Sequence, residues 1–112
     1  NTKQSRLGKG PAIDFQIRNR KGQIVDSFTI PEEQVNRFFS AASSASRGRQ
    51  WTIDPYGDSI FSCQQCKSLR EDSVSVLDQV SGPGGRECFA TIAGAISRVA
   101  DDPSLNLFVV GN

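Results

Sequence analysis

The most informative absence in this 112-residue chain is histidine, which does not occur at all. Nucleophilic sites built on Ser-His-Asp or Cys-His pairs and zinc sites with histidine ligands are therefore excluded. Cysteine is also scarce, because only Cys63, Cys66 and Cys88 are present. An odd, sparse set of this kind is unlike the dense even sets of small secreted domains. We expect reduced thiols and a cytoplasmic location.

Long hydrophobic runs are missing as well. No stretch approaches the ~20 apolar residues needed to cross a bilayer, and the polar start of the chain lacks the apolar core of a secretion signal. We expect no contact with a membrane. Charge of one sign is also lacking overall, since the formal net charge is only +1. This value argues against a dedicated nucleic-acid binder.

The charges that are present are unevenly distributed. Residues 1–50 carry nine Lys or Arg and four Asp or Glu, whereas residues 51–112 carry four and eight. Such asymmetry indicates an interaction surface of one sign. The chain is of ordinary size for one domain, so we expect residues 12–112 to form a single domain after a flexible lead-in at residues 1–11, which ends at a proline.

The hydrophobic pattern predicts an α+β fold with elements in the order β-β-α-β-α-α-β. Strands at 13–18 and 23–30 form a hairpin, and a helix opens at Pro31 and fades into the serine-rich loop that follows. A short strand at 51–53 comes next. One helix then runs from about Ser62 to Val80, and another carries Phe89, Ile92, Ile96 and Val99 at helical spacing and ends before Asp101.

The closing segment, residues 105–110, is apolar on both faces. A strand of this kind is usually central and covered. We therefore expect a small, mostly antiparallel sheet in which the last strand lies between earlier strands, with the helices packed mainly on one face.

Three groups of residues suggest chemistry. Cys63 and Cys66 form a C-x-x-C pair at a helix start with Ser62 as N-cap, which is the arrangement of a thiol-disulfide oxidoreductase, although small structural cysteines explain it as well. Asp54 and Asp58 span a turn and suggest a metal-free hydrolase, or simply turn and cap residues. The glycine-rich stretch 81–86 suggests an anion site or an interhelical loop. We expect no metal and no cofactor.

A second set of residues suggests binding to another protein. Glu71, Asp72 and Asp78 fall mostly off the apolar face of the predicted helix at 62–80, so they form an acidic surface that would attract a basic partner. Trp51 and Tyr56 belong to residue types enriched at interface hot spots.

The segment Trp51 to Gln65, WTIDPYGDSIFSCQQ, resembles the pattern D-P-Y-G-D-[ST]-x-F-N-x-x-Q of a family of small bacterial proteins. The chain departs from that pattern at Ser62, where the family has asparagine. It also ends in Asn112, where the family ends in an acid. Members of this family are similar to the immunity proteins encoded beside polymorphic and contact-dependent growth inhibition toxins.

The resemblance implies a protein that is not an enzyme but binds a cognate bacterial toxin, such as a nuclease, as a monomer in a 1:1 complex and blocks its active site. The residues expected to contact the partner are Trp51, Asp54, Tyr56, Asp58, Glu71, Asp72 and Asp78. Thiol-disulfide exchange at Cys63 and Cys66 is the alternative function.

Overall fold

The computed structural model describes residues 12–54, 57–79 and 84–111. The predicted lead-in at residues 1–11, Tyr56 and residues 81–83 of the glycine-rich stretch lie outside these ranges. The strands are β1 (Ala12–Arg18), β2 (Ile24–Pro31), β3 (Asp58–Phe61) and β4 (Asn106–Val110). The helices are α1 (Glu32–Ala45), α2 (Cys63–Asp72), the four-residue α3 (Val76–Gln79) and α4 (Gly85–Ala100). The predicted α+β class is confirmed.

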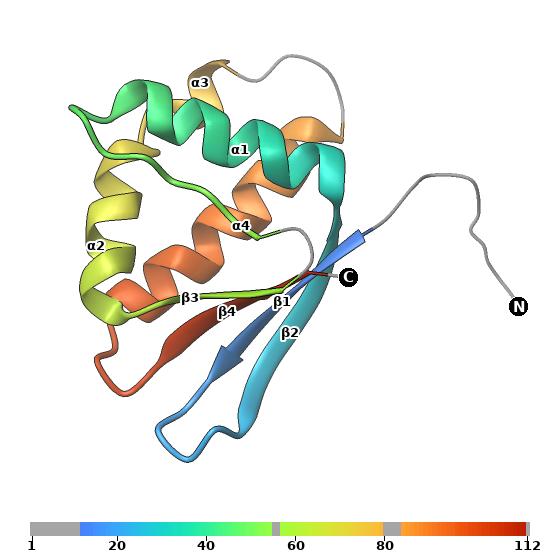
Figure 1. The fold of residues 1–112 in the computed structure, drawn as a ribbon, viewed down its shortest axis with the longest axis vertical. Helices are drawn as coiled ribbons and strands as arrows, with labels where there is room; N and C mark the ends of the chain where they lie inside the picture. The colour runs from blue at the N-terminus through green and yellow to red at the C-terminus, as the bar shows by residue number, and fades with distance from the viewer. Residues whose placement is uncertain (1–11, 55–56, 80–83, 112) are drawn as a thin grey trace, which may run out of the picture.

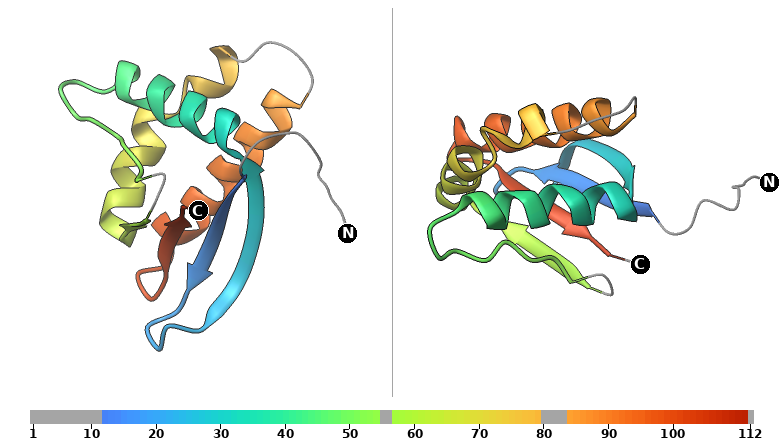
Figure 2. Two further views of the ribbon diagram at one scale, coloured as in Figure 1. Left: turned by 45° about the vertical axis from the view of Figure 1, so that its right-hand side comes forward. Right: turned by 90° about the horizontal axis from the view of Figure 1, so that it is seen from above.

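The four strands form one antiparallel sheet in the order β2-β1-β4-β3. The closing strand β4 lies between β1 and β3, with Leu107 opposite both Ile17 and Phe61. The prediction that the last strand inserts between earlier ones is therefore confirmed. In Figure 1 the helices all lie on one side of this sheet, and the second view in Figure 2 agrees.

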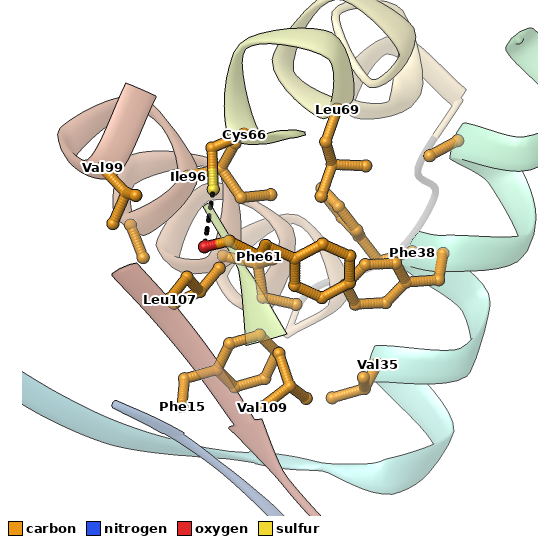
Figure 3. Close-up of a cluster of buried hydrophobic side chains, with 14 of the residues drawn as sticks. Phe15, Val35, Phe38, Phe61, Cys66, Leu69, Ile96, Val99, Leu107 and Val109 are labelled. Carbon is orange, nitrogen blue, oxygen red and sulfur yellow. Dashed lines mark hydrogen bonds between the residues drawn. The ribbon is translucent and has the colours of Figure 1, made fainter. Parts of the chain in front are cut away.

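One hydrophobic cluster fills the space between the sheet and the helices. Side chains alternate along β1, so that Ile13, Phe15 and Ile17 are buried while Asp14 is exposed. Helix α1 contributes Val35 and Phe38 to the same cluster, and Phe61 of β3 lies among them (Figure 3). The face of the sheet turned away from the helices carries Ile60, which is 54% exposed.

The prediction of a strand at residues 51–53 is wrong. No strand forms there, and the third strand is Asp58–Phe61, which pairs with β4 in the register Ile60 to Phe108. The backbone N–H and C=O of Trp51 are both bonded to the Ser43 side chain, at 2.7 and 3.1 Å. These groups are consequently not available to pair with a strand of the sheet.

Helix α1 ends at Ala45, inside the serine-rich stretch in which it was predicted to fade, and Ala42 of that stretch is buried in the core. One predicted helix limit is wrong. The single helix expected from Ser62 to Val80 is two helices, since α2 ends at Asp72 and a turn precedes α3. None of the helices in the described ranges has the length and apolar composition that a membrane crossing requires.

Candidate functional site

The described residues of the DPYGDS segment build a tight turn before β3. The Gly57 N–H donates to the Asp54 carbonyl at 3.3 Å, and the Asp54 N–H donates to the Ser59 hydroxyl at 3.1 Å. A Cβ at Gly57 would lie 2.7 Å from Oδ2 of Asp54. A larger residue at this position would therefore require the exposed Asp54 carboxylate to rotate away.

The second half of the segment starts helix α2. The Gln65 N–H donates to the Ser62 hydroxyl at 3.2 Å, and the Ser62 N–H donates back to Oε1 of Gln65 at 2.9 Å. This reciprocal pair is a capping box, which satisfies two N–H groups at the helix start. Serine is among the residues preferred at an N-cap. The predicted N-cap at Ser62 is confirmed.

The end of the chain is connected to the same turn. The Gly111 N–H donates to the Gly57 carbonyl at 2.9 Å, which joins the residue after β4 to this turn. The turn and cap residues of this segment therefore organise local structure. Asp54, Asp58 and Ile60 are exposed, and they remain accessible from outside.

The strongest polar cluster in the described residues surrounds Asp72. Its carboxylate accepts two hydrogen bonds from the Arg49 guanidinium, at 2.7 and 2.9 Å, and one from Nε1 of Trp51, at 2.6 Å. The hydrogen bonds from Arg49, and to a smaller extent that from Trp51, hold the pKa of Asp72 below its ordinary value. We call Arg49, Trp51 and Asp72 the Asp72 cluster.

The expectation that Asp72 lies on the exposed polar side of its helix is wrong, because Asp72 is only 7% exposed. It lies three residues after the buried Leu69, and residues three apart share a helix face. Sequence reasoning missed the partner Arg49, which lies 23 residues earlier in a loop. The spacing from Leu69 was the one available signal that Asp72 faces inward.

The Asp72 cluster lies beside a groove between α1 and residues 50–53. The groove has a volume of about 310 Å³, and its lining includes Asn36, Ser40 and Ser43 from α1 and Trp51 from the facing segment. The Ser43 hydroxyl bonds to both backbone groups of Trp51 at one end of this groove. The arrangement fixes Trp51 between α1 and the end of α2.

The other two acidic candidates of this region remain exposed. Glu71 directly precedes Asp72, the last residue of α2, and Asp78 lies in α3. Between them Val74 is 77% exposed, the highest fraction among the large apolar side chains of the described residues. The Val74 N–H donates to the Glu71 carbonyl at 3.4 Å. We call Glu71, Val74 and Asp78 the corner patch.

The two cysteines of the C-x-x-C pair act as hydrogen-bond donors. The thiol of Cys63 donates to the Ala100 carbonyl at 3.2 Å, and that of Cys66 lies 4.0 Å from the Phe61 carbonyl (Figure 3). Burial, and to a smaller extent Cys63, raises the pKa of Cys66 to about 12. Since the thiolate is the reactive form, Cys66 stays protonated at neutral pH and packs as a core residue.

No group of three or more potential metal ligands forms among the residues that the structure describes. At the glycine-rich stretch, Gly84 precedes α4 with φ of 85°, a conformation that favours glycine, and its carbonyl accepts from Cys88 N–H at 2.9 Å. Asp54 and Asp58 do not line the groove.

Comparisons of this chain with protein-family models, curated proteins and solved structures found no match.

Proposed function

We propose that this protein is an immunity protein, which binds a cognate bacterial toxin and neutralises it by covering the active site or another essential surface. The resemblance of residues 51–65 to an immunity-like family supports the proposal. The observation that carries it is the position of Asp72, which ties Trp51 to the end of α2. Trp51 lines the groove, and Asp72 directly follows Glu71 of the corner patch in the sequence.

Such a surface combines the features that protein interfaces use. Trp51 is of a residue type enriched at hot spots, and its indole is fixed by Asp72 while its backbone is fixed by Ser43. A side chain that is already ordered loses little entropy when a partner binds. This preorganisation favours binding, and it requires no catalytic group.

The corner patch adds electrostatic attraction. Glu71 and Asp78 are exposed carboxylates, and Val74, which lies between them in the sequence, is exposed as well. Charges of this kind accelerate encounter with a partner of opposite sign, and the effect weakens as salt screens it. A toxin with a basic surface, such as the substrate groove of a nuclease, is the complementary partner.

Co-purification with the product of the adjacent upstream gene tests the proposal. We expect a 1:1 complex in which the toxic activity of that product is abolished. Recovery of the two proteins as separate species, each with unchanged activity, would contradict the proposed function.

A charge-reversal pair tests the role of the corner patch. We expect Glu71→Lys with Asp78→Lys to slow association about tenfold at low salt, measured by stopped-flow mixing. The control is Glu33→Lys with Glu87→Lys, which changes the net charge equally at two exposed positions on other helices. Equal slowing in both variants would show that net charge, and not the corner patch, directs the encounter.

A further inference from the structure

Residues 51–53 have the burial pattern of a strand, but they are not part of the sheet. Trp51 and Ile53 are half-buried against the core, whereas Thr52 and Asp54 are exposed. This alternation is that of a strand with one covered face. Within the described ranges, however, no strand of the sheet pairs with the segment.

The backbone of this segment is only partly satisfied. Both groups of Trp51 are bonded to Ser43, but the N–H and C=O groups of Thr52 and Ile53 have no hydrogen-bond partner in the part of the chain that the structure describes. Thr52 and Ile53 both line the groove that also includes residues of α1.

The groove lies between this segment and α1. Helix α1 contributes Asn36, Phe39, Ser40 and Ser43 to its lining, and residues 50–53 form the facing wall. Its volume of about 310 Å³ falls at the lower end of the range for ligand pockets, which is about 300–1,000 Å³. None of the eight lining residues is charged.

These features select the chemistry of the occupant. Unpaired N–H and C=O groups on an extended segment are a template for another extended chain. A lining of amides and hydroxyls, with Phe39 and Trp51 beside them, accepts main-chain groups and small or apolar side chains. A charged side chain would find no opposite charge among these lining residues.

We propose that the groove receives an extended, uncharged segment of the toxin, which pairs with the backbone of Ile53 and packs against Trp51. This inference rests on the proposed function and specifies where the toxin binds. Asn36 and Gln50, which line the groove, supply side-chain amides that bond to the main chain of the inserted segment. In this proposal the corner patch accelerates association with the toxin, and the groove stabilises the complex once it has formed.

A matched pair of serine variants on α1 tests this proposal. Ser40 lines the groove, whereas Ser44 does not, and both are exposed on the same helix. We expect Ser40→Arg to fill the groove and raise the Kd for the toxin product of the upstream gene at least tenfold. We expect Ser44→Arg to change Kd less than twofold. Circular dichroism and thermal melting of both variants confirm that each is folded.

Hydrogen exchange provides a second measurement that needs no variant. In the complex, the Ile53 amide should exchange at least tenfold more slowly than in the free protein, because it becomes paired. The Trp51 amide should change less, since Ser43 already holds it.

The outcomes separate this proposal from the proposed function. No complex with the toxin would overturn both. A tight complex in which Ser40→Arg binds as the wild type does, with unchanged Ile53 exchange, would overturn the groove proposal alone. A concentration-dependent dimer of the free protein that Ser40→Arg abolishes would show that a second copy is the occupant, which would also overturn it.

Discussion

The Asp72 cluster and the corner patch lie next to each other at the end of α2, and they use carboxylates in opposite ways. Asp72 is 7% exposed and accepts three hydrogen bonds from Arg49 and Trp51. Glu71, its neighbour in sequence, and Asp78 face solvent beside the exposed Val74. Of these three acidic residues, Asp72 stabilises the fold, whereas Glu71 and Asp78 are free to interact with a partner.

The difference shows why charge counted along a sequence does not define an interaction surface. A buried carboxylate must be satisfied by donors, because its desolvation is costly. Once satisfied, it is unavailable to a partner. An exposed carboxylate contributes little to stability but acts at a distance. The following variants test whether this division holds.

The largest effect on stability is expected from Asp72→Ala. Hydrogen bonds to charged groups contribute roughly 1.5–3 kcal/mol each, and the contribution is reduced here because Arg49 is 52% exposed and regains water. We expect the free energy of unfolding to fall by about 2 kcal/mol, measured by urea denaturation. The control Asp78→Ala should change it by less than ~0.5 kcal/mol. Equal effects of the two variants would remove the distinction between the regions.

The contribution of Asp72 to the free energy of unfolding should depend on pH. The folded pKa of Asp72 is lowered by Arg49, below the unfolded value of about 3.9. The stabilisation is thus complete above about pH 4 and is lost as the pH falls through the lower folded pKa. We expect the stability difference between wild type and Asp72→Ala to shrink below about pH 4. A difference that stays constant down to pH 2 would contradict the ion pair as its source.

A smaller effect is expected from Ser43→Ala. This change removes the hydroxyl that bonds to both backbone groups of Trp51, so we expect a loss of about 1 kcal/mol and a red shift of the tryptophan fluorescence as Trp51 becomes more solvated. The matched control is Ser44→Ala, whose hydroxyl is on an exposed residue of the same helix. A loss in the control as large as that in Ser43→Ala would show that the bonds to Trp51 contribute nothing.

The smallest effect on stability is expected from Val74→Ser. Since Val74 is 77% exposed, its replacement should change the free energy of unfolding by less than ~0.5 kcal/mol. Thermal melting measures this directly. A loss above 1 kcal/mol would show that Val74 is packed in solution and that the corner patch is not an open surface.

Several elements could be predicted because their signals are local. The alternation of Ile13, Phe15 and Ile17 specifies β1, and the helical spacing of Phe89, Ile92 and Ile96 specifies α4. Ser62 acts as an N-cap through bonds that span three residues. The central position of β4 could also be inferred from its apolar residues on both faces, although only Leu107 and Val109 are fully buried and Phe108 on the opposite face is partly exposed.

The failures at β3 and at Asp72 involve partners in other elements of the fold. Residues 51–53 have the pattern of a strand, but Ser43 takes the backbone groups of Trp51. Residues 58–61 became the strand because β4, more than forty residues later, pairs with them. Asp72 is buried because Arg49 reaches it from a loop 23 residues earlier.

The sequence by itself determined the α+β class, the covered faces of β1 and α4, and the exclusion of histidine chemistry. These depend on composition and on short-range periodicity, which dictate which side chains can be buried. Only the tertiary structure decided which segment became β3, which carboxylate faces inward and that a groove lies beside Trp51. The position of β3, the burial of Asp72 and the groove all depend on contacts between segments that are brought together only when the chain has folded.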